Sequence, residues 1–308
     1  MSAIGLEFVP QTWVLRRAMP ARRAHPLDEP LRRVSALDGP ARAGLGLSGR
    51  PLSAWTLATE LTEVPSLRLA HTLRRVGVHF GTADRLVMSS LFFGSYTWQL
   101  AAASLGSLLL SGHVPDASAE NVAVHIGHDG RVDEVRFLGG GFATVAGSPA
   151  AEHPDAVLVP HLDALRELLL RRMTNGHLEE LMLALQAENG LGMRALWAAL
   201  EDRCIGALVW LGTRLDRADD VVAEAAALGR TPPFVGSSSV QHHVCGDQRE
   251  LSQVRGFCCL RYRLDDRGAC ATCPIRRTMS STAPTQPALV ASRCPTPLPS
   301  PACLASKL

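Results

Sequence analysis

Residues 86–112 carry no charged side chain, and this apolar run constrains the fold more than any other feature of the sequence. A run of this length can cross a lipid bilayer. It also contains Ser, Thr, Gln and Tyr, and its glycines lie among other small residues, a pattern that favours helices buried in a globular core. We therefore expect core helices that begin after Asp84 and end by Gly112 and Pro115, and no stable membrane insertion.

The remaining patterns predict a mainly helical α+β protein. Apolar residues at helical spacing begin near Leu67 and recur in four later segments, 161–173, 177–188, 192–213 and 217–228. Between them, two alternating runs flank Asp129-Gly130, a dipeptide typical of tight hairpin turns. The expected strands are 121–126 and 132–137, followed by a loop or bulge at the three glycines 139–141.

Composition divides the chain into three parts. Residues 1–52 are rich in Pro and Arg, which predicts a poorly ordered arm with at most one short helix. Residues 53–277 form the expected domain, closed by a cysteine-rich loop at 255–277. Residues 278–308 are rich in Pro, Ser and Thr, a composition that predicts a disordered tail. Cys294 and Cys303 lie in this tail, and we do not expect them to be ligands.

The charge balance and the cysteine count narrow the class of protein. The formal net charge is +2, and no basic run is interleaved with aromatic residues, so nucleic acid is not an expected partner. Eight cysteines in 308 residues are too few for a disulfide scaffold. We find no secretory signal at the start and expect a cytoplasmic protein whose thiols are reduced.

Four of the eight cysteines lie between residues 258 and 273, in the stretch CCLRYRLDDRGACATC. Cys270-x-x-Cys273 is a common half-site for metals, and thiolates suit zinc, Cu(I) and iron–sulfur clusters. The adjacent pair Cys258-Cys259 fits a zinc site poorly, because neighbouring side chains on a strand point to opposite faces. A [2Fe–2S] cluster is wider than a single ion and accepts four cysteines. A thioredoxin-like interpretation is weaker, because no strand-then-helix pattern surrounds the motif.

Arginines crowd the same stretch and favour a redox role. An all-cysteine [2Fe–2S] cluster is negatively charged and becomes more so on reduction. Nearby guanidinium groups would stabilise the reduced form and raise the potential. The alternative is that these are ordinary solvated side chains of an arginine-rich protein. The arginines concerned are Arg255, Arg261, Arg263, Arg267, Arg276 and Arg277.

The pattern C-C-x10-C-x2-C, with Tyr262 and Arg263 after the adjacent pair, resembles the C-terminal motif of the FhuF-type ferric-siderophore reductases. This resemblance implies a [2Fe–2S] cluster held by Cys258, Cys259, Cys270 and Cys273. It also implies one-electron reduction of Fe(III) in an imported ferric siderophore, of hydroxamate type, by a cytoplasmic protein. The motif is specific, whereas the wider likeness over residues 67–275 is loose.

Other interpretations remain open at this stage. They are a redox sensor or electron carrier of the same ancestry, and a structural zinc module. No flavin or dinucleotide motif is present, so a separate electron donor, such as a ferredoxin or a reductase, is expected. His242, His243 and Cys245 lie just upstream, and we expect a loop there without a role in the site. Cys204 lies in the apolar stripe of the 192–213 helix, so we expect it to be an inert core thiol.

Overall fold

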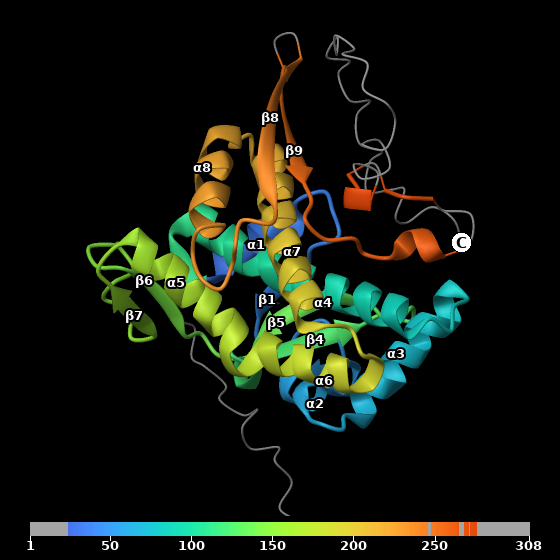
Figure 1. The fold of residues 1–308 in the computed structure, drawn as a ribbon. Helices are drawn as coiled ribbons and strands as arrows, with labels where there is room; N and C mark the ends of the chain where they lie inside the picture. The colour runs from blue at the N-terminus through green and yellow to red at the C-terminus, as the bar shows by residue number, and fades with distance from the viewer. Residues whose placement is uncertain (1–23, 246–247, 265–267, 271, 276–308) are drawn as a thin grey trace, which may run out of the picture.

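The computed structural model describes residues 24–245, 248–264, 268–270 and 272–275. Helix α4 (Arg85–Ser111) runs through the middle of the protein, between a four-stranded sheet and helix α7 (Met193–Leu215) (Figure 1). Most of its side chains are buried, although it carries several Ser, Thr and Gln residues. None of the described helices is long and apolar enough to cross a membrane. The uncharged run is therefore a core helix, as its small and polar residues predicted.

Side-chain and backbone caps define the ends of α4. The carboxylate of Asp84 accepts hydrogen bonds from the backbone N–H groups of Leu86 and Val87, at 3.0 and 3.4 Å. These bonds satisfy donors that have no partner within the helix. At the other end Gly112 takes a left-handed conformation (φ 67°), which ends the helix as predicted.

The expected hairpin lies at the centre of the main sheet. Strands β4 (Val122–Ile126) and β5 (Val132–Phe137) pair antiparallel, with Gly130 at φ 77° in the turn. The sheet has the order β1-β5-β4-β2, where β1 is Ala43–Leu45 and β2 is Trp55–Leu57. The pairing of β1 with β5 is parallel, so this sheet is larger and more mixed than the sequence suggested.

The N-terminal arm is shorter than predicted, because residues 24–52 belong to the folded part of the protein. They include helix α1 (Asp28–Ala36) and strand β1, and the side chains of Leu27, Leu31 and Val34 are fully buried. The physical reason is that a short amphipathic helix buries its apolar face against α4 despite the surrounding prolines. The structured part of the chain thus begins well before residue 53, whereas the proposed tail at 278–308 lies outside the described residues.

A second sheet lies at one side of the molecule. It has the order β3-β6-β7, formed by His113–Pro115, Phe142–Val145 and Ala156–Val159. The three glycines at 139–141 lie in the connection between β5 and β6, as predicted. This sheet packs against helix α5 (Leu162–Met173).

Three of the remaining helices follow the predicted order, namely α3 (Leu67–Phe80), α6 (Glu179–Asn189) and α8 (Ala218–Leu228). Helix α2 (Ala58–Thr62) was not predicted, and a kinked turn at Thr174–Leu178 lies between α5 and α6. Asn175 and Gly176 leave helical geometry at this kink. There the buried His177 ring bonds to the Tyr96 hydroxyl and to the carbonyl of Ala117, each at 2.6 Å.

Candidate iron–sulfur site

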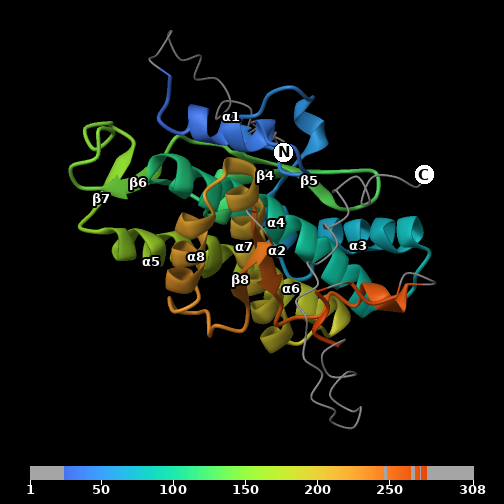
Figure 2. The same ribbon diagram turned by 90° about the horizontal axis from the view of Figure 1, so that it is seen from above.

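The cysteine-rich loop follows a hairpin of two strands, β8 (Ser239–Cys245) and β9 (Gln248–Val254). The hairpin projects from the body of the protein, and the loop after β9 returns along α7 towards α4 (Figures 1 and 2). The sequence predicted a loop at residues 242–245, whereas the backbone there is a strand. In the strand register, Cys245 pairs with Gln248 at the far tip, and Ser239 pairs with Val254 at the base. Cys245 is six residue steps of about 3.4 Å each from the base, so it lies far from the other cysteines.

Two consecutive carboxylates on α7 hold the segments on either side of this hairpin. The side chain of Asp202 is almost fully buried and accepts hydrogen bonds from the backbone N–H groups of Gly256 and Phe257, at 2.9 and 3.2 Å. It also forms an ion pair with Arg255, at 3.0 Å. Glu201 accepts bonds from the Ser237 hydroxyl and the Ser238 N–H, at 2.8 and 3.1 Å. Helix α7 therefore fixes where the cysteine loop starts.

The loop also contacts the first half of α4. The hydroxyl of Ser90 donates a hydrogen bond to the carbonyl of Cys259, at 2.9 Å. Further along, the guanidinium of Arg263 pairs with Asp84, the residue that caps α4, at 3.0 Å. Both contacts join residues that are far apart in the sequence, and together they place the adjacent cysteine pair beside α4.

The four cysteines of the motif come together in two close pairs. The sulfurs of Cys258 and Cys273 lie 3.7 Å apart. This separation is too long for a disulfide, whose sulfurs lie about 2.05 Å apart. Cys259 and Cys270 lie close enough for each thiol to shift the pKa of the other. Cys259 and Cys273 are buried, whereas Cys258 and Cys270 are partly exposed, so the group reaches the protein surface on one side.

The backbone around Cys258-Cys259 shows how two adjacent cysteines can contribute to one site. Leu260 takes a left-handed conformation, with φ 59°, so the chain leaves strand geometry directly after Cys259. The turned backbone brings the N–H groups of Leu260 and Arg261 close to the sulfurs of Cys258 and Cys259, where each N–H favours the thiolate form. At the second pair, the N–H of Cys273 bonds to the carbonyl of Cys270, at 3.0 Å, which closes the C-x-x-C turn.

The electrostatic environment favours a thiolate at Cys259. The thiol of Cys270 donates to it, and the nearby Arg255 and Arg203 guanidinium groups further lower the pKa of Cys259. The same hydrogen bond, together with burial, raises the pKa of Cys270. Burial raises the pKa of Cys258 to about 11. The loop therefore stabilises negative charge at Cys259, whereas ligation of a metal by Cys258 and Cys270 requires that they lose protons against their raised pKa values.

Three of the six arginines of the cysteine loop lie in the described residues, and they have different partners. Arg255 bonds to Cys259, and its pKa is raised because Asp202 and the Cys259 sulfur outweigh the effect of burial. Arg263 instead pairs with Asp84, and Arg261 contributes its backbone N–H to a sulfur. The three remaining arginines, Arg267, Arg276 and Arg277, lie outside the described residues, as do the side chains of His242, His243 and Cys245.

Sequence reasoning missed Arg203, which projects from α7 towards the cysteines. Burial and the charge of Arg255 lower the pKa of Arg203, while Cys259 and Cys270 act in the opposite direction. The signal was present, because Glu201, Asp202 and Arg203 interrupt an otherwise apolar helix. Cys204 follows them and is fully buried in the core, where burial raises the pKa of its thiol. It is the inert core thiol that the stripe predicted.

Comparison with known families agrees with this geometry. Residues 90–242 match the family described as ferric iron reductase FhuF-like transporter, and residues 255–274 match the FhuF 2Fe-2S C-terminal domain. The chain belongs to the FhuF family. Its cofactor is a [2Fe–2S] cluster, because the second match covers all four cysteines of the motif.

Comparisons beyond the family give little further information. No curated protein sequence matches this FhuF-family chain. Among solved structures, the aerobactin synthetase IucA of Klebsiella pneumoniae is 16% identical, with a TM-score of 0.41, and the similarity covers 52% of this chain and 30% of that one. The aerobactin synthetase IucC of the same organism is 15% identical, with a TM-score of 0.37, over 56% and 31% of the two chains. The chain thus spans about a third of the length of these proteins, and the likeness is too low to support an inference about function.

Proposed function

We propose that this FhuF-family protein is a ferric-siderophore reductase whose cluster is held by Cys258, Cys259, Cys270 and Cys273. The observation that carries the assignment is the convergence of these four thiols in a loop fixed to two core helices. The residues fit the group, because four cysteines from one loop can supply the four thiolate ligands of an all-cysteine cluster. The buried arginines beside them offset the negative charge that the ligands bring.

When bound, a [2Fe–2S] cluster supplies one electron at a time. Fe(III) in an oxygen chelator is the proposed substrate, and one electron converts it to Fe(II), which hydroxamate oxygens hold more weakly. The protein has to hold its cysteines near the surface, and the partial exposure of Cys258 and Cys270 meets this need. A separate donor, a ferredoxin or a reductase, then restores the electron. We place this reaction in the cytoplasm.

A single-turnover assay tests the proposal. Chemically reduced protein is mixed anaerobically with a ferric hydroxamate siderophore in the presence of a ferrous chelator. We expect one ferrous complex per cluster oxidised, with the bleached visible spectrum of the reduced protein returning to its oxidised form. If the protein stays reduced and no ferrous complex forms, the alternative of a sensor or an electron carrier replaces the reductase.

The ligand assignment has its own test. Anaerobically purified protein should contain about two irons and two sulfides per chain. Cys259→Ser should remove or markedly alter the cluster spectrum, and Cys204→Ser should leave it intact because that thiol is buried in the apolar core on α7. Colourless protein loaded with zinc would support the structural zinc module instead.

A further inference from the structure

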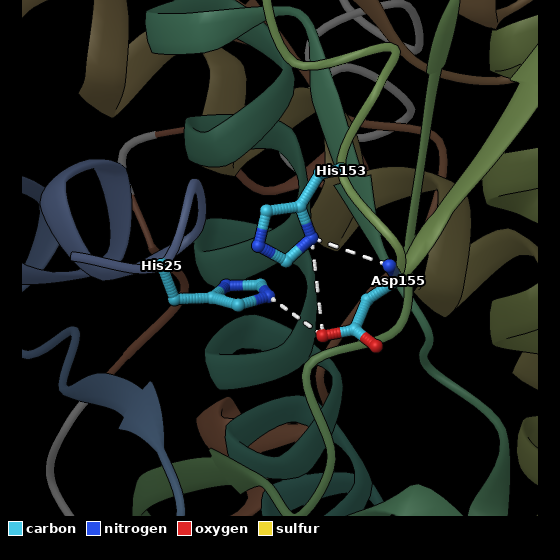
Figure 3. A group of neighbouring side chains, drawn as sticks. All are labelled: His25, His153 and Asp155. Atoms are coloured by element: carbon cyan, nitrogen blue, oxygen red, sulfur yellow. Dashed lines mark hydrogen bonds and ion pairs between the residues drawn. The ribbon is translucent and has the colours of Figure 1, made fainter. Parts of the chain in front are cut away.

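A second group of metal-binding side chains lies in the part of the protein that carries β6 and β7. His25 comes just before α1, and His153 and Asp155 come just before β7 (Figure 3). The Nε2 atom of His25 lies 3.5 Å from an Asp155 carboxylate oxygen, and the Nδ1 atom of His153 lies 3.9 Å from the same oxygen. All three potential ligand atoms lie within 4.8 Å of one another. In Figures 1 and 2 the sheet that carries them and the cysteine loop lie at opposite sides of the molecule.

The middle glycine of the 139–141 stretch leaves room beside these atoms. A Cβ atom on Gly140 would stand 2.6 Å from Nε2 of His25 and 3.2 Å from the Asp155 oxygen. A Cβ on the neighbouring Gly141 would meet only Asp116, at ordinary contact distances of 3.6 Å or more. A side chain at Gly140 would therefore fill the space beside His25 and Asp155, whereas a side chain at Gly141 would not.

Contacts with neighbouring residues hold both imidazole rings in place, but one ring nitrogen of His25 lacks a good hydrogen-bond partner. The Nε2 atom of His25 is buried and makes no hydrogen bond of normal geometry within the described residues. Its ring packs edge-on against those of Phe142 and His153. Burial and the proximity of His153 lower the pKa of His25, which favours the neutral imidazole, the form that binds metals. A buried polar atom without a partner is uncommon and calls for a physical explanation.

We propose that His25, His153 and Asp155 form a binding site for one divalent transition-metal cation of the zinc class. Two imidazole nitrogens and one carboxylate oxygen are a common ligand set for such ions, and water takes the fourth position. Asp155 keeps 39% of its side chain exposed, so the site is open to solvent on that side. The side chains of His25 and His153 are more enclosed, at 13% and 24% exposed.

Cation binding would exchange weak contacts for coordination bonds. At present Nδ1 of His25 accepts the N–H of Leu27, and Nδ1 of His153 accepts the N–H of Asp155, both at 3.2 Å. The cation would take the place of the Nε2 proton of the neutral His25 ring. Because the coordinated ring stays neutral, that proton moves through solvent to Nδ1, which then gives up the hydrogen bond that it accepts from Leu27. The consequence is a link between the segment before α1 and the loop before β7, which favours the folded state by mass action.

Zinc binding to the intact, cluster-containing protein tests this proposal. The protein is dialysed against zinc under anaerobic conditions, and bound metal is measured by mass spectrometry while the visible spectrum confirms that the cluster is retained. We expect one zinc per chain beyond the cluster irons. His25→Ala and Asp155→Asn should weaken binding by more than the roughly tenfold that loss of a supporting contact costs.

A pair of glycine variants separates a bound cation from a general folding effect. Gly140→Ala should abolish zinc binding and Gly141→Ala should retain it, with both proteins folded by circular dichroism. Zinc should raise the melting temperature of the wild-type protein and of the Gly141→Ala variant, but not that of Gly140→Ala. The proposal is overturned if the wild-type protein binds no saturable zinc, or if Gly140→Ala and Asp155→Asn bind it as the wild-type protein does. His71→Ala, at an exposed histidine on α3, controls for surface binding.

Discussion

The guanidinium of Arg203 on α7 lies against the backbone of Gly94 on α4, where a Cβ atom would stand 2.5 Å from Nη2. Because Gly94 has no side chain, α4 leaves space for the guanidinium of Arg203, which comes from the neighbouring helix α7. The charge of Arg203 acts on Cys259 and Cys270. The packing of two core helices therefore places a positive charge beside the proposed cluster ligands.

Loss of this charge should lower the reduction potential of the cluster. In Arg203→Gln, the more negative reduced form loses a stabilising cation, so the potential falls. We expect a fall of tens of millivolts, and about 59 mV corresponds to a tenfold change for one electron. A redox titration followed by electron paramagnetic resonance measures it. Arg194→Gln, at an exposed residue of the same helix, should leave the potential unchanged; equal potentials in all three proteins would refute the role of Arg203.

Displacing the guanidinium without removing it should act in the same direction. In Gly94→Ala the new methyl group pushes Arg203 from its position, so the potential should fall by less than in Arg203→Gln. The matched control is Gly106→Ala on the same helix, where a Cβ atom would meet Val34 Cγ2 at 2.3 Å. This control should reduce stability without moving the potential. A Gly94→Ala protein with the wild-type potential would show that the Arg203 contact has no electrostatic effect.

Asp202→Asn should loosen the cluster. The carboxylate accepts two backbone hydrogen bonds and pairs with Arg255 in an almost fully buried site. Removing one partner of a buried ion pair costs about 3 to 5 kcal/mol, because the other charge is left unpaired. We expect faster loss of iron to a chelator, measured by the decay of visible absorbance. Glu201→Gln, which weakens contacts to Ser237 and Ser238 instead, should lose iron more slowly than Asp202→Asn does.

His177 should make stability depend on pH. Burial lowers its pKa from 6.5 to about 4, so between these values the unfolded state binds more protons than the folded state. The stability contributed by the neutral ring is therefore complete above about pH 6.5 and is lost as the pH falls towards 4. A shift of this size corresponds to about 3 kcal/mol.

Substitution of the ring tests the pH effect. Gln can accept from Tyr96 and donate to Ala117 but does not titrate, so the stability lost in His177→Gln should be larger at pH 7 than at pH 4.5. Urea unfolding of the anaerobic protein at several pH values measures the difference. A difference that stays constant across this range would mean that His177 does not titrate as its burial predicts.

Much of the fold followed from local patterns. The uncharged run became α4, with Asp84 and Gly112 at its ends, and Asp129-Gly130 formed the turn of the β4–β5 hairpin. The interpretation of residues 24–52 was less accurate, because Pro and Arg content does not reveal that three apolar side chains of one short segment reach the core. Apart from β4 and β5, the strands of the described residues were not predicted, because each is defined by its pairing with another strand and not by a pattern of its own.

The sequence by itself indicated the family and the cofactor. Four thiols in the C-C-x10-C-x2-C spacing specify a soft-metal site, and that spacing carries the family resemblance. Only the tertiary structure decided what surrounds those thiols. Asp202, Arg203 and Ser90 lie more than fifty residues from the motif and approach it because α4 and α7 pack together in the core. The same holds for His25, His153 and Asp155, because long-range packing sets such distances and no local pattern encodes them.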